Sequence, residues 1–159
     1  MLRNMTSVYI LNDDKILMLY RIGSRVVEPS WCGIGGHFEN HELNDPEACV
    51  LRELHEETGL NPNDICILKL KYITLRLKNN EIRQNYFFFA DLHKKEFILP
   101  ECDEGILEWV DIIDVFNRTM PISSTFCLKH YFETGRFNSN QYSGVITKNG
   151  IDFAVLEEF

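Results

Sequence analysis

The sequence predicts a mixed α and β fold in which helices cover a mixed β-sheet. Runs rich in β-branched and aromatic residues lie both before and after a helical segment, and polar or glycine-containing turns separate them. A second helical segment follows near the end of the chain. Strands and helices in this order favour packed layers, with helices against the faces of one sheet.

The first expected elements are a hairpin and a loop. Residues 7–21, SVYILNDDKILMLYR, contain two apolar runs around the polar turn from Asn12 to Lys15, which is typical of a β-hairpin. Residues 21–36, RIGSRVVEPSWCGIGG, are rich in glycine, proline and serine and have no regular period. We expect a loop here that enters a short strand.

The next segment carries the start and stop signals of a helix. Asp45 is a suitable N-cap, Pro46 fits the first helical position, and Gly59 fits the stop after the last turn. Together these signals predict a helix of about thirteen residues.

The second half of the chain completes the sheet and adds the second helix. The candidates, in chain order, are strands at 64–77, 81–92 and 107–112, a helix at 123–135, and a hairpin around Asn149-Gly150. The helix candidate starts with serine and ends with glycine. Phe87, Phe88 and Phe89 must alternate between the two sides of their strand, and a core on both faces accounts for them.

Composition predicts one soluble domain spanning residues 1–159, because 45% apolar content in 159 residues supports one substantial core. The five cysteines form no C-x-x-C pair, and an odd number cannot all pair internally, so we expect reduced thiols and a cytoplasmic location. The chain lacks both a signal-peptide core and an apolar run of about 18 residues, so no membrane association is expected. The net charge of −8 argues against nucleic-acid binding.

The segment LRELHEETGL, residues 51–60, is unusually acidic for a helix. Glu53, Glu56 and Glu57 share a stripe roughly opposite the apolar side, so we expect these carboxylates to face outward. Like charges three and four residues apart repel, and they lie toward the helix C-terminus, where the macrodipole disfavours negative charge. A solvated surface face is the simple interpretation. The alternative is a site for Mg²⁺ or Mn²⁺, which prefer carboxylate oxygens.

A longer pattern favours the metal site. The segment from Gly36 to Leu60 resembles the Nudix box, G-x5-E-x7-R-E-U-x-E-E-x-G-U, where U is aliphatic. The matching positions are Gly36, Glu42, Arg52, Glu53, Leu54, Glu56, Glu57, Gly59 and Leu60. Nine residues rather than seven separate Glu42 from Arg52, and we interpret LNDP as a two-residue insertion before the helix. The role of Glu42 depends on how the chain accommodates it.

The resemblance implies an α/β/α sandwich around a mixed sheet and hydrolysis of a nucleoside diphosphate linked to another group. It implies that Glu53, Glu56 and Glu57 hold Mg²⁺ or Mn²⁺, with the backbone carbonyl of Gly35, and that Arg52 orients a glutamate. The cations would offset the repulsion between an acidic protein and a polyphosphate.

Two glutamates are candidates for the general base. Glu53 could take the proton of the attacking water. Glu104 lies five residues before Trp109, a relation that some nucleoside-triphosphate members of the family share. An ordinary acidic loop position is the alternative for Glu104.

Several residues near the glycines are candidates for substrate contacts. Arg21 and Arg25 could bind phosphate oxygens, with surface solubility as the alternative, and Gly36 would lie beside the substrate. Trp31 could stack on a base, although packing is the preferred interpretation. His37 and His41 do not make a convincing zinc pair, because no cysteine or third ligand accompanies them.

The segment WCGIGGHFE is similar to the loop of Nudix hydrolases that act on oxidised purine nucleoside triphosphates. The region that reads the base in those enzymes corresponds here to TMPISSTF, with Met120, Ser123 and Ser124 but no carboxylate, so purine recognition by that route is not expected. Met120 and Phe126 fit an apolar wall or, by preference, the core.

Our first functional hypothesis is a pyrophosphohydrolase that converts a (d)NTP, oxidised or not, into a nucleoside monophosphate and pyrophosphate. The alternatives are an ADP-ribose or nucleotide-sugar pyrophosphatase, a non-catalytic nucleotide sensor, and an isomerase that would use Cys32. The C-terminal hairpin could cover a sheet edge, line the substrate cleft, or form a homodimer contact.

Overall fold

The computed structural model describes residues 1–22, 28–93 and 97–158. Its strands are β1 (Leu2–Asn12), β2 (Lys15–Arg21), β3 (Ser30–Cys32), β4 (Ile65–Lys78), β5 (Glu81–Leu92), β6 (Gly105–Asp111), β7 (Tyr142–Thr147) and β8 (Gly150–Val155). Its α-helices are α1 (Pro46–Thr58) and α2 (Ile122–Glu133). Short 3-10 turns are η1 (Asn40–Glu42), η2 (Pro62–Asp64), η3 (Ile112–Asn117) and η4 (Gly135–Phe137).

Within these described residues, the strands form one mixed sheet in the order β3-β2-β1-β5-β4-β7-β8, and β6 pairs with β2. Pairs β1–β5 and β4–β7 are parallel, whereas β1–β2, β2–β3, β2–β6, β4–β5 and β7–β8 are antiparallel. The prediction of a mixed sheet covered by helices is therefore confirmed. Neither helix in the described part is long and apolar enough to cross a bilayer.

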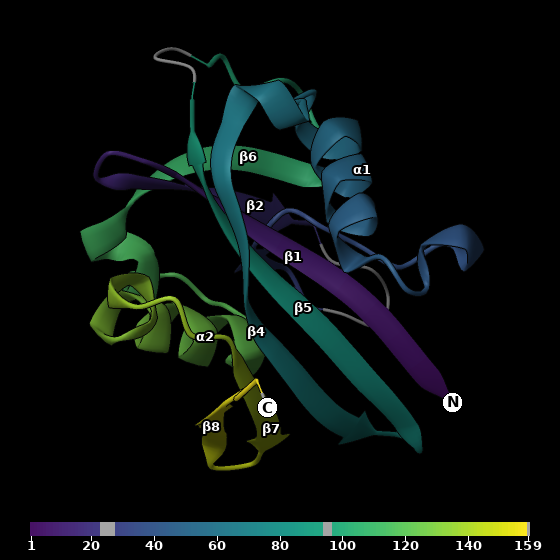
Figure 1. Cartoon of the computed structure of the whole chain (residues 1–159). Coiled ribbons are helices and arrows are strands. Elements are labelled where there is room, and N and C mark those ends of the chain that lie inside the picture. The colour runs from purple at the N-terminus through teal and green to yellow at the C-terminus, as the bar shows by residue number, and fades with distance from the viewer. Residues whose placement is uncertain (23–27, 94–96, 159) are drawn as a thin grey trace.

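The two helices cover opposite faces of the sheet (Figure 1). One buried cluster joins Val50 and Leu54 of α1 to Val8 and Phe88 of the sheet. The other cluster joins Cys127 and Leu128 of α2 to sheet residues that include Tyr9, Tyr72, Phe87 and Phe89. The three consecutive phenylalanines thus alternate between two cores, as the period of a strand requires.

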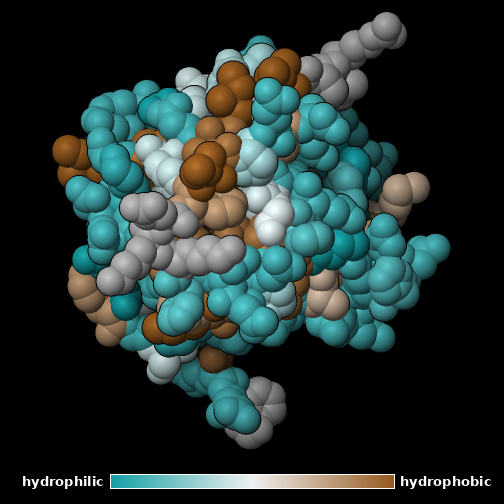
Figure 2. Space-filling view, turned by 90° about the horizontal axis from the view of Figure 1, so that it is seen from above, coloured by the Kyte–Doolittle hydropathy of each residue, from teal (hydrophilic) through white to brown (hydrophobic). Residues whose placement is uncertain are grey.

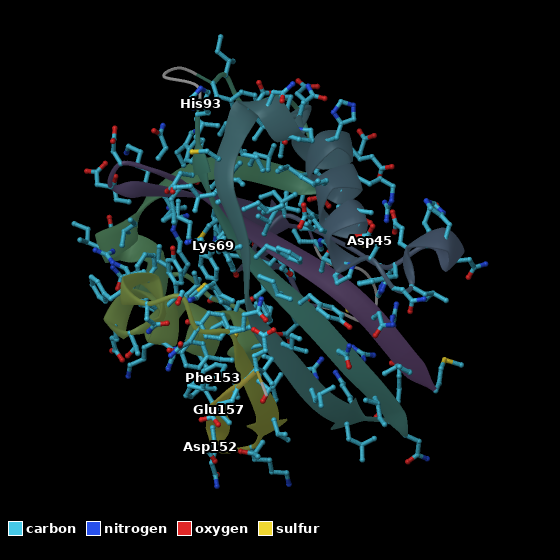
Figure 3. The ribbon with its side chains drawn as sticks, viewed as in Figure 1. Asp45, Lys69, His93, Asp152, Phe153 and Glu157 are labelled. Atoms are coloured by element: carbon cyan, nitrogen blue, oxygen red, sulfur yellow. The ribbon has the colours of Figure 1, made fainter. Side chains whose placement is uncertain are left out.

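The helix that carries the acidic segment begins and ends as expected. Asp45 accepts a hydrogen bond from the Ala48 backbone N–H at 3.0 Å, and Pro46 is the first helical residue. Gly59 has a φ of 74°, in the left-handed region that favours glycine. Asp45 lies at the start of α1 in Figure 3. These caps fix α1 relative to the loop before it.

Helix α2 begins differently from the expectation. Its N-cap position is Pro121, which has no side chain to cap the helix, and Ile122 is the first helical residue. Ser123 and Ser124 therefore lie inside the first turn, and Ser124 is buried. The serine start was a wrong signal because proline can fix the entry of the chain without a side-chain cap.

The C-terminal hairpin extends the sheet beyond β4. Its register pairs Thr147 with Gly150, so Lys148 and Asn149 form the two-residue loop. The ring centroid of Phe153, on β8, lies 5.1 Å from that of Tyr72 and 4.8 Å from that of His130. The hairpin therefore covers the edge of β4 and also supports α2.

The face seen from above in Figure 2 is largely hydrophilic, with hydrophobic residues gathered near its middle and its top. This surface agrees with a chain in which 25% of the residues are charged.

Candidate active site

The glycine-rich segment lies along one edge of β1. The Val8 N–H donates to the Ile34 carbonyl at 2.7 Å, and the Thr6 N–H donates to the Gly36 carbonyl at 2.9 Å. Gly35 has a φ of 149°, and a side chain there would collide with the Thr6 carbonyl oxygen. Only glycine fits this position, so its backbone can pass close to β1.

Two of the acidic residues of α1 face this segment. Glu53 and Glu57 are 8% and 5% exposed. A Cβ at Gly36 would lie 2.5 Å from Glu53 Oε1, so the missing side chain makes room for that carboxylate. The Gly35 N–H donates to Glu57 Oε2 at 3.3 Å.

The expectation that all three carboxylates face outward was wrong for Glu53 and Glu57. Only Glu56 lies outward, with a side chain that is 55% exposed. A helical wheel counts glutamate as a solvent-facing residue, but the glycines leave space for carboxylates beside the sheet edge.

Arg52 gathers three glutamates around one guanidinium. Its Nε and Nη2 donate to the two oxygens of Glu42 at 2.7 and 2.9 Å. Its Nη1 donates to Glu53 Oε1 at 2.9 Å and to Glu56 Oε2 at 3.0 Å. Nη2 also donates to the His37 carbonyl at 3.0 Å.

The fork shape of the guanidinium permits the bidentate contact with Glu42. Glu42 is 2% exposed, so the two extra residues before α1 do not prevent its approach to Arg52.

Arg21 joins the other predicted groups. Its Nη2 donates to the Gly35 carbonyl at 3.0 Å and to Glu57 Oε1 at 3.2 Å, and it forms an ion pair with Glu104 Oε2 at 2.6 Å. Its Nε is buried and has no hydrogen-bond partner among the described residues. One guanidinium therefore supplies positive charge to Glu57 and Glu104 while one of its own donors remains unused.

The carboxyl groups have opposite pKa shifts. Burial raises the pKa of Glu57 to about 8, although the charge of Arg21 opposes the shift. Burial also raises the pKa of Glu53, against the hydrogen bond from Arg52. Hydrogen bonding from Arg52 lowers the pKa of Glu42 to about 2. The two carboxylates beside the glycines are therefore short of positive charge, whereas Glu42 is not.

The oxygen atoms gathered at this site are suitable ligands for a hard divalent cation. Carboxylate oxygens of Glu53, Glu56 and Glu57 and the carbonyl of Gly35 are ligands of the kind that Mg²⁺ and Mn²⁺ prefer. In the described part of the chain, no three His, Cys, Asp or Glu side chains already converge as a metal-binding group. Arg21 instead forms an ion pair with Glu57, and Arg52 forms ion pairs with Glu53 and Glu56, so a cation at this site would compete with two guanidinium groups.

The remaining candidates near the glycines have other contacts. The Trp31 ring lies 4.2 Å from the Arg118 guanidinium and 5.1 Å from the Tyr20 ring, which agrees with packing. His37 Nε2 lies 2.7 Å from Arg3 Nη2, whereas His41 Nδ1 lies 3.4 Å from Glu39. The two histidines thus have separate partners.

Arg25 falls within residues 23–27, which lie outside the described part of the chain.

Cys32 lacks the lowered pKa of an activated nucleophile. Burial raises the pKa of its thiol to about 11, despite the nearby charge of Arg21. The Sγ–H donates to the Leu19 carbonyl at 3.6 Å. A thiol that stays protonated is a poor nucleophile, which argues against the isomerase hypothesis.

Sequence reasoning missed the link between Arg21 and Glu104. Strand β2 pairs with β6, and this register places Arg21 opposite Gly105, directly after Glu104. The signal was an arginine at the end of one strand and a glutamate just before another. Only the pairing of these distant strands turns it into a contact.

Comparisons with known proteins agree with the geometry. A family model described as the NUDIX domain matches residues 1–126. The chain is 29% identical over 125 residues to the uncharacterized Nudix hydrolase YvcI of Bacillus subtilis, covering 75% of this chain and 72% of that protein.

Two solved structures share the fold. A MutT protein from Bacillus halodurans has a TM-score of 0.70 and 21% identity, covering 96% of this chain and 97% of that one. The NUDIX domain of Shewanella oneidensis NrtR, in complex with ADP ribose, has a TM-score of 0.65 and 15% identity, covering 87% and 88%.

Proposed function

Because this chain belongs to the Nudix domain family, whose hydrolases act on nucleoside diphosphate-linked substrates, we propose a (d)NTP, oxidised or not, as its substrate. The products would be a nucleoside monophosphate and pyrophosphate, and Mg²⁺ or Mn²⁺ would be the cofactor. The observation that carries the proposal is the burial of Glu53 and Glu57 against Gly35 and Gly36. Burying two carboxylates without full charge compensation is costly unless a cation joins them.

Glu53, Glu56, Glu57 and the Gly35 carbonyl would hold the cation. When bound, it would supply Lewis-acid activation of a phosphoryl oxygen and a bound water of lowered pKa. Arg52 keeps Glu53 and Glu56 oriented through hydrogen bonds of 2.9 and 3.0 Å. This contact limits the freedom of both carboxylates before any ligand arrives.

Arg21 would bind the substrate once it leaves Glu57. Its Nε, which has no partner among the residues that the structure describes, and its Nη2 form two neighbouring donors that suit two phosphate oxygens. The positive charge of Arg21 would then be balanced by carboxylates in the free protein and by phosphate in the substrate complex.

Glu53 and Glu104 both remain candidates for the general base. Burial raises the pKa of Glu53, which makes it a better proton acceptor at neutral pH. Glu104 is 50% exposed and forms an ion pair with Arg21, so its carboxylate lies beside the site and is open to solvent.

Activity with a nucleotide panel tests this function. We expect the wild type with Mg²⁺ to release pyrophosphate and a nucleoside monophosphate. Glu57→Gln should lower kcat by about 100-fold or more, because one cation ligand and its charge are lost. Glu47→Gln, an exposed position on the same helix, is the matched control. Full activity of Glu57→Gln would refute the metal assignment.

An ADP-ribose or nucleotide-sugar pyrophosphatase is the second candidate. The NrtR domain complexed with ADP ribose supports it, since that domain shares the fold. The same panel, with ADP-ribose and a nucleotide sugar included, separates the two candidates by kcat/KM. Binding of nucleotides without turnover of any of them would favour a nucleotide sensor.

A further inference from the structure

Three arginines form a row across the sheet at the end of its long strands. Strand pairing places Arg3 of β1 opposite Arg83 of β5, and Arg83 opposite Arg76 of β4. Directly paired residues project from the same face of a sheet. We call Arg3, Arg83 and Arg76 the arginine row.

The arginine row lies on the α2 face of the sheet, beyond the part that the helix covers. Arg83 and Phe87 are four residues apart on β5 and share a face, and Phe87 packs in the cluster with Leu128 of α2. The ends of β4 and β5, with the start of β1, extend past both helices (Figure 1). The side chains of Arg3 and Arg83 are 42% and 27% exposed.

The described residues do not fully neutralise the row. Glu81 contacts Arg83 Nε at 2.8 Å and lies 3.9 Å from Arg3 Nη1. Among the described residues, none forms an ion pair with Arg76. Within residues 1–22, 28–93 and 97–158, three guanidinium groups share one carboxylate, which leaves about two unbalanced positive charges on a chain with a net charge of −8.

Unused polar atoms lie in the next row of the same face. Asn85 pairs with Thr74, two residues from Arg83 and Arg76 respectively. Thr74 is 1% exposed, and neither its Oγ1 nor Asn85 Oδ1 has a hydrogen-bond partner within the part of the chain that the structure describes. A hydroxyl can donate, and an amide can present its NH₂ after a half turn. Buried polar atoms without partners are rare, so a ligand is a physical reason for them.

This region adjoins the candidate active site through His37. The His37 side chain lies 2.7 Å from Arg3, and its backbone carbonyl accepts a hydrogen bond from Arg52. Gly36, the preceding residue, contacts the Glu53 carboxylate. The consecutive residues Gly36 and His37 therefore lie beside Glu53 and Arg3, respectively, at the edge of β1.

We propose that the arginine row, with Thr74 and Asn85, binds a phosphate monoester carried by the substrate at a distance from its diphosphate. A phosphate dianion matches the two unbalanced positive charges, and arginine binds its oxygens bidentately. This assignment rests on the proposed hydrolase function, and within it favours the second candidate class, nucleoside diphosphate derivatives, in a form that carries an additional phosphate.

Binding of inorganic phosphate tests the row without catalysis. In Chelex-treated buffer free of divalent cations, calorimetry should detect phosphate binding to the wild-type protein. Arg76→Gln should weaken it about tenfold, because a charged hydrogen-bond partner is lost. Thr74→Val, which keeps the shape but not the hydroxyl, should weaken it less. Lys148→Gln removes one charge from an exposed turn and should have no effect. Equal phosphate affinity in the wild type and Arg76→Gln, or undetectable phosphate binding in the wild type, would overturn the assignment.

Matched substrates then test whether the phosphate belongs to the substrate. ADP-ribose and ADP-ribose 2′-phosphate differ by one phosphate monoester. With the wild type and Mg²⁺, we expect the phosphorylated compound to have a KM about tenfold lower. Arg76→Gln should bring the ratio of the two KM values close to one, and Lys148→Gln should preserve it.

The outcomes separate the two proposals. Equal KM values in the wild type would overturn the substrate assignment but leave the proposed hydrolase intact. If inorganic phosphate binds to the row but the two KM values are equal, the substrate assignment is likewise overturned, and the row binds a phosphorylated ligand other than the substrate. Hydrolysis of no nucleotide would refute the proposed function, and this substrate assignment with it.

Discussion

At the scale of single residues, neighbouring glutamates have opposite electrostatic environments. Glu42 receives two hydrogen bonds from Arg52, whereas Glu57 shares one nitrogen of Arg21 with Glu104 and Gly35. Their pKa values therefore move in opposite directions. The Glu42 carboxylate therefore stabilises the fold, whereas the Glu57 carboxylate would be stabilised by a bound cation.

Glu42→Gln should destabilise the fold by roughly 2–3 kcal/mol at pH 7, because the pKa of Glu42 is lowered to about 2 from an ordinary value of 4.5. A lowered folded-state pKa contributes stability above pH 4.5, which is lost as the pH falls toward 2. Urea unfolding of both proteins between pH 7 and pH 3 measures the difference. Glu47→Gln is the control, and a difference that stays constant with pH would contradict the ion pair.

Arg21→Gln should bind Mn²⁺ several-fold more tightly than the wild type when no nucleotide is present, because a competing positive charge leaves Glu57. Its KM for nucleotide should rise about tenfold, since phosphate loses an arginine. Electron paramagnetic resonance of free Mn²⁺ gives the first quantity and steady-state kinetics the second.

The control for Arg21→Gln is Arg118→Gln, because Arg118 pairs with Glu108 and stacks on Trp31. Weaker Mn²⁺ binding in Arg21→Gln would mean that Arg21 shapes the site rather than competing for it.

At the scale of secondary-structure elements, features that depend on adjacent residues were predicted from the sequence, whereas contacts that depend on strand pairing were not. The caps Asp45 and Gly59 give the bounds of α1 because capping depends on a few adjacent residues. The burial of Glu53 and Glu57 could not be predicted, because it depends on glycines that lie along β1. The contact of Arg21 with Glu104 depends in the same way on the register of β2 with β6.

Asp45→Ala should reduce the stability of the protein by about 1 kcal/mol, since it removes the hydrogen bond to the Ala48 N–H. Urea unfolding at pH 7 measures this change, with the exposed neighbour Asn44→Ala as control. Equal losses in both variants would show that the cap contributes nothing beyond its charge and size.

At the scale of the whole molecule, the sequence predicts the layers but not the strand order. Alternating apolar runs identify most strands, and two helical segments predict covered faces. The parallel pairing of β1 with β5 joins residues about eighty positions apart, and no local pattern encodes it. The arginine row is a product of that pairing, so it was absent from the expectations.

Stability of the whole molecule should depend jointly on pH and divalent cations. The pKa of Glu57 is raised to about 8, so its burial is favourable below pH 4.5 and becomes unfavourable as the pH rises through 8. Without cations, Tm of the wild type should fall relative to Glu57→Gln over this range.

Adding Mn²⁺ at pH 8, at about 100 times its Kd, should restore roughly 2–3 kcal/mol to the wild type. Differential scanning calorimetry measures both effects. An equal gain in Glu57→Gln would place the cation elsewhere.

The extension of β4 and β5 past both helices has a further consequence for engineering. The residues that we propose as cation ligands lie on α1 and the glycine segment, whereas Thr74, Arg76, Arg83 and Asn85 lie in a hairpin that reaches away from both cores. Exchange of residues 74–85 as a cassette between relatives would transplant substrate preference while the reacting centre stays untouched.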